Sequence, residues 1–226
     1  MIPTLIIMAH RNVSIPTFIS TLRSGYNVEV RPGDALIDRA RSIAASEWMR
    51  NAKDSDVMIM TDDDFWFTKE GLDALVEVCR DVKGIVAGVT PLRSGSRTAI
   101  VPLDGSVEER WKSEQAPAEE IRWAGGLLAF HRNVFERLKD ILPLLHRNDV
   151  IPPFYPFFLP MIYEHEHDGP IELSEDYACC ERARSIGIEV WVEPRCQVGH
   201  LASVIVTAKE MQRVFEIHQP MLGRQS

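Results

Sequence analysis

The sequence predicts an α/β fold in which helices flank a mostly parallel central sheet. Over the first 90 residues, apolar segments of strand length alternate with longer segments of helical periodicity, which is the order expected for such a fold. One apolar segment, 57–60, has the short and partly β-branched character of a strand buried on both faces. The chain has 226 residues and is 45% hydrophobic, which suffices for one large core in a single domain.

Local signals delimit the elements of the first half. Ser14 is a suitable N-cap for a helix that carries Pro16 in its first turn. Pro32 and Gly33 end the strand that precedes the second helix. In chain order we expect a strand over 3–9, a helix over 14–24, a strand over 26–31, a helix over 34–51, a strand over 57–60, a helix over 72–82 and a strand over 84–89.

The helix over 34–51 has one apolar stripe, which we expect to face the core. Its members recur at helical spacing and are Ile37, Ala40, Ile43, Ala44 and Trp48. Three arginines of this helix, Arg39, Arg41 and Arg50, lie off that stripe.

The second half contains two irregular segments. Residues 90–118 are dominated by Gly, Ser, Pro and charges, which indicates a long connection with one short hairpin. Residues 150–171 are rich in proline and aromatic side chains, from which we expect a flexible lid or insertion. The remaining expected elements are an ordered segment over 121–130 with an apolar strand after its glycine pair, helices over 133–145 and 174–185, a strand over 189–193 and a C-terminal helix over 207–218.

Charge and cysteine content restrict the functional classes. The formal net charge of -8 argues against broad attraction to DNA or to anionic membranes, although Arg93, Arg97 and Arg110 offer a local track for phosphates. The four cysteines lack the paired spacing of a zinc site and are expected to be buried, reduced thiols of a cytoplasmic protein. The apolar run 5–9 is too short for a signal peptide or a membrane span.

The three consecutive acids Asp62, Asp63 and Asp64 directly follow the strand over 57–60. Carboxylates packed this closely repel one another, and a hard divalent cation such as Mg²⁺ or Mn²⁺ relieves that repulsion. A solvated acidic turn is the alternative reading. In open α/β sheets ligands bind beyond the carboxyl ends of the strands, where these acids and 10–11 are expected. The chain has neither a GxGxxG nor a P-loop motif, which disfavours a dinucleotide site of the Rossmann kind.

Three further features are candidate site elements. Gly125 and Gly126 precede an apolar strand, where they permit close approach of the backbone to a ligand or form a bulge. Glu175 and Asp176 open a helix, where acids also simply complement the helix dipole. His200 follows a glycine and is either a metal ligand or a hydrogen-bonded loop histidine. The acidic, His-rich run 164–168 lacks HExxH spacing and reads as a solvated loop.

Along the chain there follow a strand with three acids at its end, a strand preceded by a glycine pair, an acidic helix start and a Gly-His pair. With its motifs in this order, the chain resembles the GT-A glycosyltransferases. It is most similar to small family-2-like members, including those carried by viruses such as phages. The resemblance covers most of 3–202. It implies a GT-A-like, Rossmann-like fold with a nucleotide-binding half over 1–90, an acceptor and metal half over 119–206, and a C-terminal helix within 207–226. It also implies that Asp62 and Asp64, as a DxD motif, and His200 hold Mn²⁺ or Mg²⁺.

The resemblance further assigns roles around the metal. Asp176 is implied as the general base that removes the acceptor proton, with Glu175 assisting, if the reaction inverts the anomeric carbon. The implied donor is a nucleotide-sugar, and UDP-sugars are the commonest in the family. The residues implied to contact the donor are His10, Arg11, Arg39, Asp63, Trp123, Gly125 and Gly126.

More than one acceptor and more than one class of activity are compatible with these motifs. A viral member in the host cytoplasm would act on a modified DNA base, a glycan or a protein. A nucleotidyltransferase shares an acid-held metal on a similar sheet, but the segment 8–13 lacks the Gly-rich stretch that such an enzyme usually has after its first strand. A non-catalytic nucleotide-sugar-binding module is the third reading, against which the intact acids argue.

Overall fold

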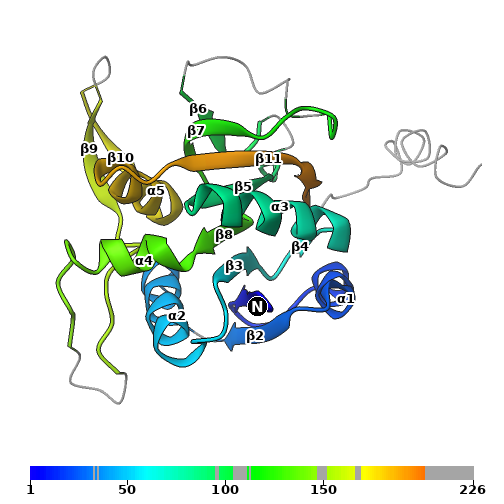
Figure 1. Cartoon of the computed structure of the whole chain (residues 1–226), viewed down its shortest axis with the longest axis horizontal. Helices are drawn as coiled ribbons and strands as arrows, with labels where there is room; N and C mark the ends of the chain where they lie inside the picture. Colours follow the sequence, from blue (N-terminus) through cyan, green and yellow to red (C-terminus); the bar gives the residue numbers. More distant parts are fainter. Residues whose placement is uncertain are drawn as a thin grey trace, which may run out of the picture.

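An eight-stranded sheet forms the centre of the molecule (Figure 1). The computed structural model describes residues 1–32, 34, 36–94, 97–103, 111, 113–146, 152–165 and 169–201. In spatial order the strands of this sheet are β2 (Asn27–Pro32), β1 (Thr4–Ala9), β3 (Val57–Asp62), β8 (Leu128–His131), β5 (Ile85–Val89), β11 (Val190–Gln197), β7 (Glu119–Ala124) and β6 (Ile100–Pro102).

The sheet is mostly parallel, as the sequence predicts. β1 runs parallel to β2 and β3, and β5 runs parallel to β11. β8 is antiparallel to its neighbours β3 and β5, and β7 is antiparallel to β11 and β6. Only β7 and β8 therefore point against the other strands of this sheet. The carboxyl ends of β1, β2 and β3 lie together at one edge, which is where ligands bind in open α/β sheets.

Helices cover both faces of the sheet (Figure 1). Trp48 of α2 (Ile37–Asn51) and Phe135 of α4 (Arg132–Leu138) belong to one core cluster, which also contains residues of α5 (Glu175–Ser185). Leu72 and Leu75 of α3 (Lys69–Val82) belong to the cluster on the other face, where α1 (Ile15–Ser24) also contacts α3. The fold is thus a three-layered α/β arrangement. None of the described helices combines the length and apolar character that a membrane span requires.

Two short ribbons complete the described structure. β4 (Phe65–Trp66) pairs with β12 (Gly199–His200), which brings the end of the described chain to the acidic turn after β3. β9 (Met161–His165) and β10 (Gly169–Leu173) form a hairpin that leads into α5. The four cysteines are buried free thiols, as predicted.

One expectation about the second half needs correction. The helix expected over 133–145 ends at Leu138. The chain continues as turns in which the N–H groups of Asp140 and Ile141 donate to the carbonyls of Arg137 and Leu138, and a proline at 143 has no N–H with which to continue a helix. The apolar strand expected after the glycine pair is β8, and the residues before the pair form β7. The C-terminal helix expected over 207–218 lies outside the described residues.

We expected a flexible lid or an insertion over 150–171, and the described part of that segment packs against the core. Phe157 and Phe158 are fully buried and pack against Phe135 and Phe130. The backbone N–H of Phe158 also donates to Ser42 Oγ of α2 at 3.0 Å. Because the aromatic side chains are part of the core, this segment is anchored to α2 and α4.

Candidate functional site

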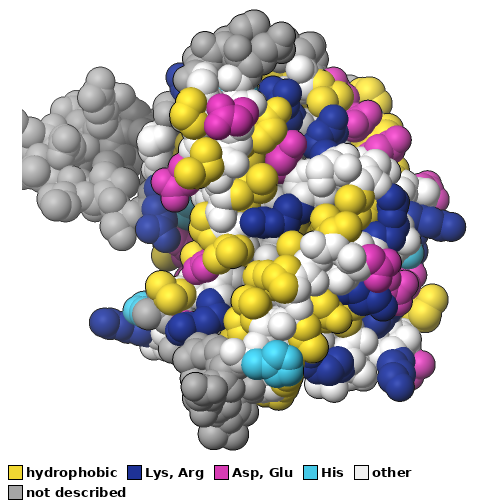
Figure 2. Space-filling model, turned by 90° about the vertical axis from the view of Figure 1, so that its left-hand side faces the viewer, with side chains coloured by type: hydrophobic (Ala, Val, Ile, Leu, Met, Phe, Trp, Pro, Cys, Tyr) yellow, Lys and Arg dark blue, Asp and Glu magenta, His cyan; other side chains and the backbone are white. Residues whose placement is uncertain are grey.

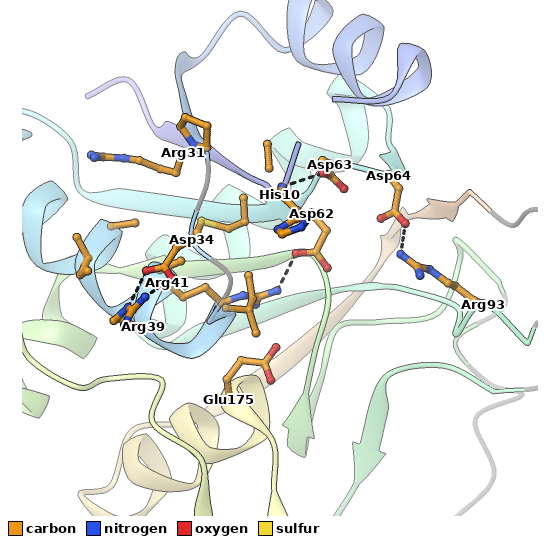
Figure 3. Close-up of a pocket in the computed structure, with 17 residues that line it drawn as sticks. His10, Arg31, Asp34, Arg39, Arg41, Asp62, Asp63, Asp64, Arg93 and Glu175 are labelled. Carbon is orange, nitrogen blue, oxygen red and sulfur yellow. Dashed lines mark hydrogen bonds and ion pairs between the residues drawn. The ribbon is translucent and has the colours of Figure 1, made fainter. Parts of the chain in front are cut away.

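A cavity of about 760 Å³ opens at the carboxyl ends of β1, β2 and β3 (Figure 3). His10 after β1, Arg31 at the end of β2 and the acids after β3 form one side of its wall. α2 contributes Ile37, Arg39 and Arg41, and the start of α5 contributes Glu175. The cavity therefore lies where the topology of the sheet predicts a ligand site.

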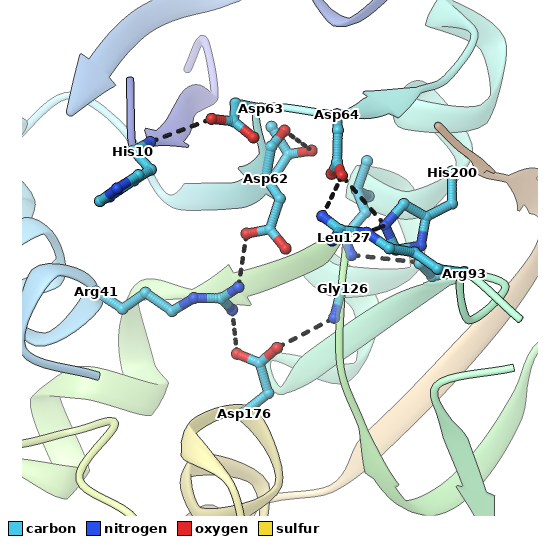
Figure 4. A network of polar contacts seen from close by, with 12 residues as sticks. His10, Arg41, Asp62, Asp63, Asp64, Arg93, Gly126, Leu127, Asp176 and His200 are labelled. Carbon is cyan, nitrogen blue, oxygen red and sulfur yellow. Dashed lines mark hydrogen bonds and ion pairs between the residues drawn. The ribbon is translucent and has the colours of Figure 1, made fainter. Parts of the chain in front are cut away.

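The three acids of the turn after β3 point to different partners (Figure 4). Asp62 Oδ1 accepts from Arg41 at 2.8 Å, Asp63 Oδ2 accepts from the backbone N–H of His10 at 3.1 Å, and Asp64 Oδ2 accepts from Arg93 at 2.5 Å. The Asp63 carbonyl also accepts from Ser14 N–H at 2.8 Å, which ties the turn to the start of α1. The buried strand before the turn and the buried Phe65 after it fix the position of the acids.

Arg41 links two of the carboxylates of the site. Its side chain is 2% exposed and pairs with both Asp62 and Asp176, which lie on different elements (Figure 4). The two carboxylates raise the pKa of Arg41 further above its usual range against the effect of burial, so it is a permanent charge. The expectation that Arg41 lies off the core-facing stripe of α2 was wrong.

The spacing of α2 contains a signal for Arg41. The residues of the helix that are buried include Arg41, Ala44, Ala45 and Trp48, which recur at i, i+3, i+4 and i+7. Ile37, by contrast, is 39% exposed and lines the cavity. The buried stripe is thus rotated relative to the expected one, and it includes a charge that two acids satisfy.

Asp176 lies beneath the cavity, whereas its neighbour Glu175 lines it. Asp176 Oδ1 accepts from Arg41 and Oδ2 accepts from the backbone N–H of Gly126 at 3.1 Å. Burial raises the pKa of Asp176 to about 7, and the Arg41 guanidinium and the Gly126 N–H oppose that rise. Both oxygens of Asp176 are therefore engaged in holding β7, β8, α2 and α5 together.

Gly126 must be a glycine for the loop between β7 and β8 to reach Asp176. Its φ is +94°, which side chains rarely adopt, and a Cβ there would lie 2.6 Å from Thr90 Cγ2. Thr90 is itself buried and cannot move away readily. The glycine pair thus serves close packing against the neighbouring acid and threonine.

Replacing Gly126 with alanine is expected to lower the free energy of unfolding by at least about 2 kcal/mol, from the positive φ and the clash together. Gly169→Ala is the matched control, because φ is +73° there and no atom lies within 4 Å of the added Cβ. In the control, the free energy of unfolding should fall by about 1 kcal/mol. Urea denaturation measures both, and equal losses would show that Thr90 does not constrain the loop.

Asp64, which lines the cavity, lies beside His200, which is not among the lining residues. Asp64 Oδ2 lies 3.4 Å from His200 Nε2. His200 Nδ1 lies 2.9 Å from the Pro91 carbonyl, which can only accept, so the hydrogen is on Nδ1 and the Nε2 lone pair faces the carboxylate and Arg93. A ring nitrogen fixed in this way to a carbonyl is the usual support for a metal-binding histidine.

Asp62 does not join this pair, because it turns toward Arg41. Across the residues that the structure describes, no three side chains of His, Cys, Asp or Glu gather as a metal-binding group. Two of the three predicted metal ligands, Asp64 and His200, are thus together. Their donor atoms fit a divalent cation that keeps most of its positions for phosphate oxygens and water. Arg93 donates to both residues, so a positive charge already lies beside them.

Arg93→Gln is expected to tighten the binding of Mn²⁺ alone by about two- to fivefold, because an exposed ion pair of up to about 1 kcal/mol no longer competes. The Arg93 side chain is 70% exposed. Titration of free Mn²⁺ by electron paramagnetic resonance measures the effect. Arg97→Gln makes the same charge change at an exposed position of the same loop and should leave the affinity unchanged. Weaker binding in Arg93→Gln would mean that Arg93 supports the site.

The predicted donor-binding residues divide into three groups. His10, Arg39 and Asp63 line the cavity, and Arg39 forms a two-bond ion pair with Asp34 there. Arg11 is exposed and is not among the residues that line it. Gly126 holds Asp176, as described above. Arg31, which also lines the cavity, was not predicted.

The prediction of a donor contact at Trp123 is not supported by its position. Trp123 is 5% exposed and stacks on Tyr177. Its indole N–H donates to Glu181 Oε2 at 2.8 Å. Trp123 therefore packs β7 against α5, away from the residues that line the cavity.

The structure describes two of the three arginines that the sequence offers as a local track for phosphates. Arg93 is bonded to the acidic turn, Arg97 is exposed, and Arg110 lies outside the described residues. On the face that Figure 2 shows, acidic and basic side chains are interspersed with hydrophobic ones, without an extended field of one charge. That face offers no continuous electrostatic footprint for nucleic acid.

Comparison with known proteins supports the fold. No protein-family model and no curated protein matches the chain. The crystal structure of A197 from STIV, a viral protein, is similar with a TM-score of 0.63 at 15% identity, over 90% of this chain and 87% of A197. The crystal structure of GalNAc-T7 with UDP, GalNAc and Mn²⁺ is similar with a TM-score of 0.51 at 13% identity, over 97% of this chain and 48% of that chain.

These similarities define a GT-A-like α/β fold, the fold of the glycosyltransferase GalNAc-T7. The chain spans about half the length of GalNAc-T7. At such low identities the likeness concerns the fold alone.

Proposed function

We propose that this protein is a metal-dependent glycosyltransferase that moves a sugar from a nucleoside-diphosphate-sugar to an acceptor hydroxyl. The observation that carries the proposal is the pairing of His200 with Asp64, which lines a cavity on a GT-A-like sheet. The two residues are far apart in the sequence, and the pairing of β4 with β12 brings them together. A solvated acidic turn would need no such partner.

The cavity suits the nucleotide part of the donor. Its volume of about 760 Å³ is within the range of about 300–1,000 Å³ that is usual for ligand sites. Met8, Ile37 and Ala40 supply apolar wall against which a base packs. His10 and Arg31, which also line the cavity, supply hydrogen-bond donors. UDP-sugars are the donors to test first, because GalNAc-T7, of similar fold, was solved with UDP.

Asp64 and His200 are the proposed protein ligands of Mn²⁺ or Mg²⁺, with Asp62 adding negative charge beside them. A divalent cation at this point would neutralise the charge that develops on the departing diphosphate. The Asp62 carboxylate is held by Arg41, and the backbone at Asp64 is held by Leu201, whose N–H donates to the Asp64 carbonyl. The chain's own contribution is therefore a rigid arrangement of charges around the diphosphate.

Glu175 is the residue that we propose to take the proton of the acceptor hydroxyl in an inverting reaction. It lines the cavity at the start of α5, whereas the buried Asp176 beside it is engaged by Arg41 and Gly126. Asp176 then acts as a positioning residue that fixes the start of α5. This reverses the roles that the resemblance to the family implies for the two acids.

Glu175→Gln tests this assignment. The variant should bind UDP with Mn²⁺ as the original protein does, while release of UDP from UDP-sugars falls by about 10²- to 10⁴-fold, the usual contribution of a general base. Glu172→Gln, on β10 outside the residues that line the cavity, is the matched control and should retain full turnover. Undiminished turnover in Glu175→Gln would remove it as the base. Absence of UDP release by the original protein from every sugar nucleotide offered, with and without glycan acceptors, would argue against the proposed function.

A further inference from the structure

Helix α1 has its polar side toward the protein and its apolar side toward solvent. Its buried residues are Thr17, Ser20, Thr21 and Ser24. They are satisfied internally: Thr17 Oγ1 donates to the Asp63 carbonyl at 3.0 Å, and Ser20 Oγ accepts from Phe67 N–H at 3.1 Å. A surface helix normally shows the opposite arrangement, with its apolar stripe on the core.

The outward face of α1 is a continuous apolar stripe. Ile15, Phe18, Ile19 and Leu22 are 74%, 54%, 39% and 68% exposed, and they recur at i, i+3, i+4 and i+7. This spacing places them on one side of the helix. Single exposed apolar residues are ordinary, but a contiguous patch on a surface helix indicates that something covers it.

The neighbouring edge strand extends this patch. β2 is the outermost strand on its side of the sheet (Figure 1), and its Val28 and Val30 are 42% and 48% exposed. Phe18 and Leu22 line, together with these two valines, an apolar groove of about 280 Å³. The groove therefore runs between α1 and an edge strand whose outer side has no strand partner in the described part of the chain.

The described chain ends close to this groove. Leu201 N–H donates to the Asp64 carbonyl at 2.9 Å, and the adjacent Asp63 carbonyl accepts from Ser14 N–H at 2.8 Å. Leu201, the last described residue, and Ser14, the N-cap of α1, therefore bond to adjacent residues of the acidic turn. Residues 202–226, 25 in number, follow Leu201 in the sequence.

The sequence of those residues complements the groove. Ala208, Met211 and Phe215 recur at intervals of three or four, while Lys209, Arg213 and Glu216 lie off that stripe. A helix over 207–218 would be about 18 Å long, and α1, with ten residues, is about 15 Å long. The segment 202–206 would span up to about 17 Å when extended, enough to connect Leu201 to the groove.

We propose that the C-terminal segment 207–218 binds as an amphipathic helix in the groove between α1 and β2, with its apolar stripe against Phe18, Leu22, Val28 and Val30. This arrangement covers the apolar face of α1 and the exposed side of β2 with a segment of the same chain. It also fixes the chain on both sides of His200, because Leu201 is then held between the acidic turn and the bound segment.

Crosslinking in the full-length chain tests the proposal. Leu22→Cys is combined in turn with Met211→Cys, Val214→Cys and Phe215→Cys, and each pair is treated with a short bis-maleimide. The native cysteines are buried, which limits their reaction. The controls pair the same tail positions with Ile162→Cys, which is 72% exposed on β9. Peptide mass spectrometry should find intramolecular crosslinks with Leu22→Cys and at most traces with Ile162→Cys.

Equal yields from Leu22→Cys and Ile162→Cys, or no crosslink from either, would overturn the proposal. Crosslinks that join two copies through Leu22→Cys would overturn it too, and would assign the groove to an interface between copies. A second measurement avoids cysteines. Phe18→Asp with Leu22→Asp should speed tryptic cleavage after Lys209 and Arg213 by about tenfold or more, which corresponds to about 1.4 kcal/mol of lost binding. Ile162→Asp should leave that rate unchanged, and equal rates in all three proteins would contradict the proposal.

Discussion

Replacing Arg41 with methionine is expected to lower the free energy of unfolding by about 3–5 kcal/mol, the usual cost of removing one partner from a buried ion pair. The substitution leaves Asp176, whose side chain is 8% exposed, with only the N–H of Gly126 as a partner. It also releases Asp62 at the edge of the cavity. Methionine keeps the length and apolar stem of the side chain, so the loss reports the charge. Urea denaturation with fitted slopes measures the change.

Arg39→Met is the matched control, two residues along the same helix. Its ion pair with Asp34 is partly exposed, with 31% of the arginine side chain accessible, and should be worth at most about 1 kcal/mol. The double variant Arg41→Met with Asp176→Asn should lose about 1–3 kcal/mol less than the sum of the two single losses, because the two groups interact directly. Equal losses in Arg41→Met and Arg39→Met would contradict the account of Arg41 as the link between the two acids.

Replacing Asp64 with asparagine is expected to weaken the binding of UDP in the presence of Mn²⁺ by at least about 100-fold, since loss of an outer-shell partner alone costs a metal site about 10- to 100-fold. The binding that remains should equal that of the original protein in EDTA. His200→Ala should act in the same direction, because its Nε2 lies 3.4 Å from the Asp64 carboxylate. Isothermal titration calorimetry, with and without Mn²⁺, measures each affinity.

Asp73→Asn provides the control for this pair. It removes one negative charge from α3, where Asp73 pairs with Lys69 and Tyr26 outside the residues that line the cavity. Its affinity for UDP should match that of the original protein. Unchanged Mn²⁺-dependent affinity in Asp64→Asn would show that the acidic turn does not hold a metal, and would leave the cavity without its proposed chemistry.

The α/β order and the acidic turn are readable in the sequence because each depends on local patterns. Short apolar runs become buried strands, and Ser14 caps α1 as expected, with its Oγ accepting from Thr17 N–H at 3.3 Å. The pairing of Asp64 with His200 follows from the resemblance to a family. The residues themselves do not reveal it, because only the pairing of β4 with β12 brings them together.

The role of Arg41 could not be predicted from local patterns. Its charge predicts a solvent-exposed side chain, whereas its position on the helix is also compatible with a buried one. An arginine on a helix is usually solvated, and the expected stripe excluded it. The buried set Arg41, Ala44, Ala45 and Trp48 has equally good helical spacing. The choice between the two stripes depends on Asp62 and Asp176, which are distant in the sequence and satisfy the charge.

The segment 152–165 was misread for a related reason. Proline and aromatic residues together indicate irregular backbone, and the backbone is irregular as far as 160. Irregular backbone does not imply mobility, however, because Phe157 and Phe158 fill the space between α2 and α4. Local composition indicates the backbone conformation of a segment. Whether the segment packs into the core depends on elements that are distant in the sequence.

The measurement that tests the central claim most directly is the thermal unfolding of the full chain with UDP, GDP, ADP, CMP and TDP, each in Mn²⁺ and in EDTA. A ligand at about 100 times its Kd stabilises by about 2.7 kcal/mol, which raises the Tm of a domain of this size by about 5–10 °C. We predict that one nucleoside diphosphate gives such a rise in Mn²⁺ and loses it in EDTA. No rise with any nucleotide, or an equal rise in EDTA, would contradict a metal-dependent nucleotide-sugar site.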